Sequence, residues 1–165
     1  MNRMKFVGAI FIIALLMTLP VQAFTADSLT IQVQSTGDAQ IQFNYTLNWL
    51  EHIAVFLQIA DPAKELKNAL ESNLKHPVTV EDVTSSSMRV DVNNFASVSV
   101  KNGETTMKTP VLSFAEAEHI LNRYWFAPLV SPDFSPATTV IVYPDNYTLT
   151  YINQDTIPGT SHIIK

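Results

Sequence analysis

Cysteine is absent from this chain of 165 residues, and glycine occurs only four times. Without cysteine there can be no disulfide framework, no lipid-modified cysteine and no thiolate metal site. The sequence also contains no glycine-rich phosphate loop and no Gly-x-Ser-x-Gly motif for a nucleophilic serine. The hydrophobic core alone must therefore hold the fold, and several common kinds of catalytic centre are excluded.

Long apolar runs are missing as well, except at the N-terminus. Arg3 and Lys5 precede an uninterrupted apolar run at residues 6–17, and Pro20 stands just before Val-Gln-Ala at residues 21–23. This pattern is typical of a secretory signal peptide, and the run is shorter than the ~20 residues of a bilayer span. We expect residues 1–23 to be cleaved off as a signal peptide. An uncleaved membrane anchor is the alternative.

Basic residues are scarce in the expected mature chain, residues 24–165. Without Arg3 and Lys5 it has eight basic and 15 acidic residues, which is a formal charge of −7. This balance disfavours nucleic acid and anionic lipid as partners, because both require clustered lysine and arginine. No second apolar run follows, so we expect one extracytoplasmic domain, secreted or at the cell surface, without a membrane span after cleavage.

Polar and apolar residues alternate along much of the chain, which predicts strands. Residues 39–49, "AQIQFNYTLNW", alternate without a fault, and residues 29–34 alternate in the same way. "STGD" lies between them, and Gly37 suits the left-handed backbone of a tight turn. These two runs should form an antiparallel hairpin.

The segments "PVTVEDV" and "MRVDV" are also predicted to be strands. Two further hairpins are predicted later in the chain. The Asn102-Gly103 pair is a strong turn signal, and a two-residue turn there places Val98 opposite Met107. The last hairpin joins "TTVIVY" to "YTLTYI" through a turn at residues 144–146, where proline presets the backbone.

Three segments predict helices. Residues 49–60 are apolar on nearly every side, and residues 61–74 begin with Asp61 as a cap and Pro62 in the first turn. "SFAE" at residues 113–116 is a capping box that starts a helix reaching about Tyr124. We therefore expect an α+β domain, with an antiparallel sheet of about seven or eight strands built from hairpins, covered by a bent helical pair and one further helix.

Candidate catalytic and metal sites are weak. Glu116 and His119 have the Glu-x-x-His spacing of di-iron bundles, but the chain has no second copy of that motif. Glu81 and Asp82 are adjacent in a predicted strand, so their side chains face opposite ways, and a solvated edge or a bulge explains them better than catalysis. We expect no catalytic residue, no metal site and no cofactor.

The stretch "YWFAPLVSPDFSP" is the most suggestive for binding. Tyr124, Trp125, Phe126 and Phe134 lie there among prolines and could form a contact surface for a glycan, a peptide or a neighbouring subunit. The alternative, which the sequence favours, is that these aromatic side chains plug the open end of the core.

"NYTL" occurs twice and makes Asn44 and Asn146 candidate N-glycosylation sites. Chance alone accounts for about two such matches at this content of asparagine, serine and threonine. The recurrence is therefore explained by strand alternation, and modification depends on a host that has the machinery.

The stretches "GDAQIQFNYTLNWLEHIAVFLQIADPAKELKNALESN" and "LSFAEAEHILNRYWFAPLVSPDFSP" resemble small exported proteins of unknown function from methanogenic archaea. The resemblance covers most of residues 29–162, and its least generic pieces are "IADPAKELKNALE" and "YWFAPLVSPDFSP". It implies a secreted or cell-surface archaeal domain and implies nothing about catalysis.

These observations predict a non-enzymatic binding or structural module of the cell envelope or extracellular space, with an unknown protein or glycan partner. One alternative is a subunit of a surface layer or filament, in which the strand at residues 29–34 pairs with a neighbouring molecule. A second alternative is an exported hydrolase that uses surface carboxylates.

Overall fold

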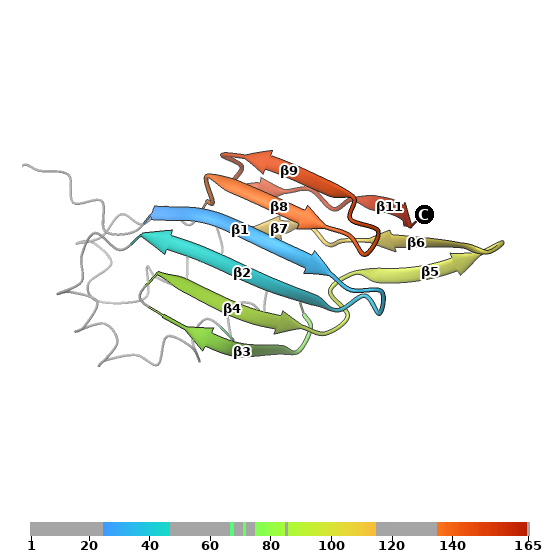
Figure 1. Ribbon diagram of the computed structural model, residues 1–165, viewed down its shortest axis with the longest axis horizontal. Coiled ribbons are helices and arrows are strands. Elements are labelled where there is room, and N and C mark those ends of the chain that lie inside the picture. Colours follow the sequence, from blue (N-terminus) through green and yellow to red (C-terminus); the bar gives the residue numbers. More distant parts are fainter. Residues whose placement is uncertain are drawn as a thin grey trace, which may run out of the picture.

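The computed structural model describes residues 25–46, 67, 71, 75–84, 86–114 and 135–164. These residues form eleven strands arranged in three sheets (Figure 1). The strands in chain order are β1 (Thr25–Val33), β2 (Ala39–Thr46), β3 (Val78–Val83), β4 (Ser87–Val92), β5 (Ser97–Lys101), β6 (Glu104–Lys108), β7 (Leu112–Ser113), β8 (Thr138–Val142), β9 (Thr148–Ile152), β10 (Thr156–Ile157) and β11 (Ser161–Ile164).

The largest sheet has six strands in the order β3-β4-β2-β1-β8-β9. The hairpin predicted for its centre is confirmed, because β1 and β2 pair antiparallel with Ile31 opposite Ile41. Gly37 has a φ of 92° in the connecting turn, as expected. The contact between β1 and β8 is parallel, with Ile31 opposite Ile141. The first strand therefore lies inside the sheet with partners on both sides.

The other two predicted hairpins are also confirmed. In the β5–β6 hairpin, Val98 pairs with Met107 across the Asn102-Gly103 turn. In the β8–β9 hairpin, the N–H of Tyr143 donates to the carbonyl of Tyr147 at 2.9 Å. A left-handed asparagine occurs in each turn, Asn102 in the first and Asn146 in the second.

The segments "PVTVEDV" and "MRVDV" contain the strands β3 and β4, which pair antiparallel. Their register shifts between Val80 and Asp82, which leaves Glu81 in a bulge on an edge strand. The expectation that the two adjacent carboxylates mark a solvated edge or a bulge is confirmed. A bulge and exposed acidic side chains are common devices that keep an edge strand from pairing with other molecules.

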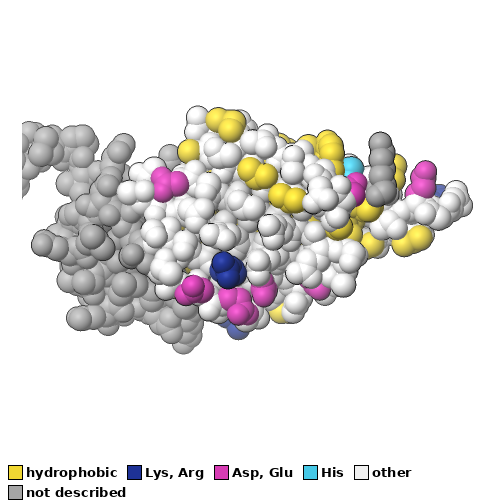
Figure 2. All heavy atoms as spheres, in the orientation of Figure 1, with side chains coloured by type: hydrophobic (Ala, Val, Ile, Leu, Met, Phe, Trp, Pro, Cys, Tyr) yellow, Lys and Arg dark blue, Asp and Glu magenta, His cyan; other side chains and the backbone are white. Residues whose placement is uncertain are grey.

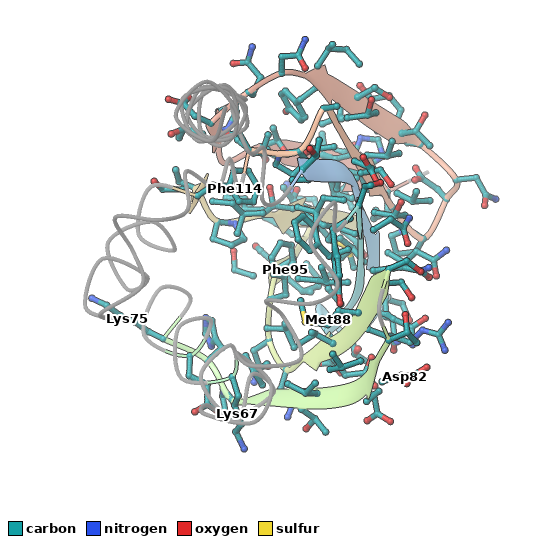
Figure 3. All side chains as sticks on the ribbon, turned by 90° about the vertical axis from the view of Figure 1, so that its left-hand side faces the viewer. Lys67, Lys75, Asp82, Met88, Phe95 and Phe114 are labelled. Atoms are coloured by element: carbon teal, nitrogen blue, oxygen red, sulfur yellow. The ribbon has the colours of Figure 1, made fainter. Side chains whose placement is uncertain are left out.

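The core lies between the inner face of the six-stranded sheet and the two smaller sheets, whose orders are β11-β6-β5 and β10-β7. Met107 of β6, Leu112 of β7 and Ile157 of β10 are buried against the large sheet. Figure 3 shows the large sheet curving around this interior, with Phe95 and Met88 directed inward. The large sheet contributes nine residues to this core cluster: Leu29, Ile31, Val33, Ala39, Ile41, Val78, Val90, Val92 and Ile141.

The expected α+β fold class is wrong. The described structure is predominantly β, with strands divided among three sheets, and Lys67 and Glu71 are the only helical residues among those that the structure describes. A single antiparallel sheet is also wrong, because β1 and β8 run parallel. The physical reason is that strands from the smaller sheets bury the inner face of the large sheet, a role that the sequence assigned to helices.

The predicted helices, over residues 49–74 and 113–124, fall almost entirely outside the described residues. Within the first range, Lys67 and Glu71 are described and helical, and their side chains form an i,i+4 ion pair at 3.8 Å. Ser113, the expected cap of the other helix, ends β7 and pairs with Thr156 of β10.

The outer face of the six-stranded sheet is mostly polar and uncharged (Figure 2). On this face Gln40 donates to Asp91 at 3.3 Å, and the amide of Asn44 donates to the Ser28 hydroxyl at 2.9 Å. Charged side chains gather over β3 and β4 at the lower edge of the view. Alternation along the strands therefore separates a polar outer face from the buried inner face.

The expected signal peptide, residues 1–23, lies outside the described residues. Among the residues that the structure does describe, no helix has the length and apolar character needed to cross a membrane.

Candidate functional site

The structure does not place the aromatic contact surface expected from the sequence. Tyr124, Trp125, Phe126 and Phe134 all lie outside the described residues. The Glu116 and His119 pair lies outside them as well. A site must therefore be sought among the strands and turns of the described part.

The two candidate glycosylation sites have different surroundings. Asn44 is partly buried in the middle of β2, and its side-chain amide is hydrogen-bonded to Ser28. Asn146 is exposed in the turn between β8 and β9, with a φ of 63°. Only the second asparagine combines an exposed side chain with a turn, which is the usual setting of a modified sequon.

The carboxylates considered for catalysis are dispersed. Glu81 and Asp82 are exposed on the edge strand β3, and Figure 3 shows Asp82 pointing away from the interior. Within the described ranges, no three histidine, cysteine or acidic side chains come close enough together to hold a metal ion. The described part of the chain thus offers no convergent group of acids.

A cluster of polar and aromatic side chains lies where the β8–β9 turn meets β11. Nε2 of His162 is 2.8 Å from a carboxylate oxygen of Asp145, and both side chains are largely buried. The carboxylate can only accept, so this bond places a proton on Nε2. The other carboxylate oxygen accepts the N–H of Tyr147 at 3.2 Å. Asp145 therefore orients both the imidazole and the start of the following strand.

Two tyrosine rings enclose this imidazole. Tyr147 stacks on His162, with ring centroids 4.2 Å apart and planes 10° apart. Tyr143 approaches the same imidazole at 4.7 Å with a tilt of 53°. Tyr143 is buried, whereas Tyr147 is 45% exposed although one ring face rests on His162. The opposite face and the edges of Tyr147 account for that exposure, so it is an aromatic surface held in a fixed orientation.

A chain of hydrogen-bonded hydroxyl groups holds the Tyr143 ring of the cluster in place. The Tyr143 hydroxyl lies 2.7 Å from the Thr160 hydroxyl, which lies 3.0 Å from that of Thr109. The backbone N–H of Thr109 also donates to the carbonyl of Thr160 at 2.9 Å. These bonds join Tyr143, which directly follows β8, to the segment before β11, so the ring that touches His162 cannot turn freely.

A third tyrosine, Tyr151, lies close to Tyr143 and Tyr147. Burial raises the pKa of Tyr151, and the neighbouring Tyr143 and Tyr147 raise it further. Tyr151 lies on β9 two residues beyond Leu149, on the same face as Tyr147. Tyr151 therefore stays neutral at neutral pH and adds an aromatic ring beside the cluster.

The second ring nitrogen of His162, Nδ1, is not fully buried. Among the described residues, Thr139 Oγ1 is the only buried side-chain nitrogen or oxygen without a hydrogen-bond partner. Because Nδ1 of His162 makes no hydrogen bond to the described residues, it must reach solvent. In the neutral imidazole with its proton on Nε2, Nδ1 is an acceptor in the ring that stacks on Tyr147.

Sequence reasoning missed Asp145, Tyr147 and His162 as a group. Tyr143 and Tyr147 flank a predicted turn, and that symmetry was a signal for cross-strand aromatic contact. No local signal connects Asp145 to His162, which lies 17 residues later on a strand of another sheet. Their contact arises from tertiary structure.

Comparison of the chain with protein-family models, with curated proteins and with solved structures finds no match. Its function is therefore inferred from the chemistry of its own side chains.

Proposed function

We propose that this chain is an exported, non-catalytic binding module of the cell surface or extracellular space, and that Tyr147 contacts a glycan partner. The observation that carries the proposal is the exposed Tyr147 ring, held flat against His162 by a stacked contact at 4.2 Å. The acidic charge of the chain and its signal-like N-terminus support an extracytoplasmic role.

Glycans suit such a surface for a physical reason. The C–H groups on one face of a sugar ring carry slight positive charge, and the face of an aromatic ring carries slight negative charge. A ring that is already immobilised loses little entropy when the sugar stacks on it. Polar groups beside the ring then fix the orientation of the sugar hydroxyls. Tyr147 supplies the ring, and Nδ1 of His162 supplies a neighbouring acceptor.

The bonds within the cluster favour binding over hydrolysis. A nucleophilic hydroxyl would need to lie within hydrogen-bond reach of the histidine that activates it. Among the described residues, His162 bonds to Asp145, while the hydroxyls of Thr109 and Thr160 bond to each other. The alternative of a hydrolase that uses surface carboxylates gains no support from Glu81 or Asp82, since both are exposed on an edge strand.

The position of β1 bears on the alternative of a strand-exchanging filament. Residues 29–34 were the expected donor, yet β1 pairs with β2 on one side and β8 on the other within one molecule. Ile31, at its centre, is completely buried. Releasing this strand would expose the middle of the core, so the position of β1 favours a self-contained domain.

The proposal is tested with the full secreted protein, purified from its producing cells and applied to insoluble polysaccharides and immobilised oligosaccharides. We expect retention on at least one glycan class. Tyr147→Ala should weaken it about tenfold, because a stacked aromatic contact contributes ~0.5–1.5 kcal/mol beyond its buried area. Tyr147→Phe should retain binding, because the ring remains.

Ile152→Ala is the matched control, since Ile152 is 55% exposed at the end of β9, the strand that begins after Tyr147, and lies outside the cluster. Asp145→Asn should weaken binding, because the hydrogen bond from His162 to a carboxylate that orients the imidazole is lost. Absence of binding to every glycan, or release of reducing sugar from a bound glycan, would contradict the proposal. Native protein that stays in the cytoplasm with its N-terminus at Met1 would contradict the exported role.

A further inference from the structure

The strand β9 is one edge of the six-stranded sheet, and its described pairing is with β8 alone. It runs along the upper border of the described structure in Figure 1. Thr148, Thr150 and Ile152, which alternate along the strand, are all exposed. An edge strand presents unpaired N–H and C=O groups to another chain. β9 is therefore a place at which the sheet can be extended.

The ladder between β8 and β9 fixes which backbone groups of β9 point outward. The N–H of Tyr143 donates to the carbonyl of Tyr147 at 2.9 Å, and the N–H of Asn153 donates to the carbonyl of Ala137 at 3.0 Å. Hydrogen-bonded pairs alternate with non-bonded pairs along an antiparallel ladder, so the odd-numbered residues of β9 bond to β8. The N–H and C=O groups of its even-numbered residues therefore point away from β8.

Most of these outward groups have no partner. Among the described residues, the carbonyl oxygen of Ile152 accepts from the side-chain amide of the exposed Gln154 at 3.3 Å. The other outward groups make no hydrogen bond to the described residues, namely the N–H of Ile152 and both backbone groups of Thr148 and Thr150. The edge of β9 is thus available to another strand along most of its length.

The opposite edge of the same sheet is protected, whereas β9 is not. β3 has a bulge at Glu81 and an exposed acidic side chain at Asp82. β9 has the sequence TLTYI, which contains no charge and no proline, and it pairs with β8 in a continuous register. Threonine, tyrosine and isoleucine are also residues that favour strands. β9 therefore lacks the usual devices that keep an edge strand from pairing with another molecule.

Charge and side-chain pattern favour a second copy of this chain as the partner. The chain has a formal charge of −5, so two copies repel each other except where acidic side chains are few. β9 has none, and the next acid along the chain, Asp155, follows the left-handed Asn153 beyond the end of the strand. Leu149 and Tyr151 are half-buried on the inner face of β9. If Thr150 lies opposite Thr150 of another copy, each Leu149 lies opposite a Tyr151, which is a favourable cross-strand pair.

We propose that two copies of the protein pair antiparallel through β9, about a two-fold axis at Thr150, and so join their six-stranded sheets into one continuous sheet. The same patch is used by both copies, as in other two-fold interfaces. The N–H and C=O groups of each Thr150 bond to those of the other Thr150, and Thr148 pairs with Ile152 of the other copy. Because this contact uses up the β9 edge of both copies, it closes as a dimer. An interface of one strand pair is small, so the dimer is weak and forms at high protein concentration.

The first test uses the full secreted protein over a wide range of concentration, without glycan. Sedimentation equilibrium should show monomer and dimer in exchange. Amide hydrogen exchange should show increasing protection of Thr148, Thr150 and Ile152 as the concentration rises, whereas the amides of Leu149 and Tyr151 already bond to β8 and should not change. A protein that stays monomeric up to its solubility limit, or association that protects other strands and not β9, would overturn the proposal.

The second test places charges on the two-fold axis. Thr150→Lys and Thr150→Glu should each raise the dissociation constant of the dimer at least tenfold, because like charges then lie directly opposite each other. An equimolar mixture of the two variants should recover the dimer, since opposite charges then face each other. Recovery that fails in the mixture, or undiminished dimerisation of both single variants, would show that the axis does not lie at Thr150.

Gln32→Lys is the matched control. Gln32 is exposed on the same outer face of the sheet, but it lies on β1, which has strand partners on both sides. The added charge should therefore leave dimerisation unchanged. Equal weakening of the dimer by Gln32→Lys and Thr150→Lys would indicate a general effect of charge and contradict pairing through β9.

Discussion

The backbone N–H of Ala96 donates to the carbonyl oxygen of Gly37 over 2.8 Å, which ties the β1–β2 turn to the residue that precedes β5. Gly37 has a left-handed φ of 92°, and a Cβ there would collide with the carbonyl oxygen of Ala96 and lie 2.9 Å from Cγ2 of Val98. This contact joins the large sheet to the three-stranded sheet. Glycine is required both for the turn and for the close approach of the two backbones.

Gly37→Ala is expected to destabilise the protein by about 3 kcal/mol, as the sum of left-handed strain and of displaced backbone. Gly103→Ala is the matched control, because Gly103 also has a positive φ but no atom lies near the added Cβ. It should cost only the ~1–2 kcal/mol of left-handed strain. Urea unfolding curves of both variants measure the difference. Equal losses would show that the contact with Ala96 is unimportant.

Thr139→Val is expected to stabilise the protein by about 1 kcal/mol. Thr139 is 1% exposed, and its hydroxyl has no hydrogen-bond partner, so the present fold includes an unsatisfied buried polar atom. The opposite result is expected for Thr109→Val, since the buried Thr109 hydroxyl is bonded to that of Thr160. Thermal unfolding of the two variants should therefore shift the melting temperature in opposite directions.

Asp38 is expected to contribute to the pH dependence of stability. Hydrogen bonds from the N–H of Asn94 and from the Thr36 hydroxyl lower the pKa of Asp38 below its ordinary value of 3.8. A lowered pKa in the folded state means that this stabilisation is present above pH 3.8 and is lost as the pH falls through the folded-state pKa. Asp38→Asn should then be less stable than wild type at neutral pH and approach it in acid. Urea unfolding at a series of acidic pH values gives both profiles, and a constant difference between wild type and Asp38→Asn at every pH would contradict the assignment.

Glycosylation is expected at Asn146 and not at Asn44 when the protein is produced in a host that modifies such sequons. Asn146 is exposed in a turn, whereas the Asn44 amide donates to Ser28 within the sheet. Peptide mapping by mass spectrometry should find the sugar on Asn146, and Asn146→Gln should return the intact mass to that of the unmodified chain. A modified Asn44 would imply attachment before the sheet forms.

The local sequence pattern was sufficient to predict strand pairing where the two strands are neighbours in the sequence. The hairpin turns at Gly37, at Asn102-Gly103 and after Pro144 follow from turn chemistry and alternation, because a short connection leaves few ways to align two strands. The bulge at Glu81 was also anticipated, since two adjacent acids are unfavourable on a half-buried strand.

Contacts between segments that are far apart in the chain could not be predicted from the sequence. The strand β11 was not predicted, and the contact of His162 with Asp145 therefore could not be anticipated. The predicted aromatic site at Trp125 and its neighbours lies outside the described residues, so the site proposed here depends on side chains that no sequence motif had brought together. A site of this kind forms only when the tertiary structure brings the β8–β9 turn against β11.

By itself, the sequence determined the local elements: strands with one apolar face, the turns that reverse them and an acidic surface, all of which depend on neighbours within a few residues. Tertiary structure alone decided that β1 runs parallel to β8 and that the strands divide among three sheets. It also brought Tyr147 onto His162. An apolar strand face specifies that it must be buried but not which partner buries it, so that choice belongs to the packing of the whole chain.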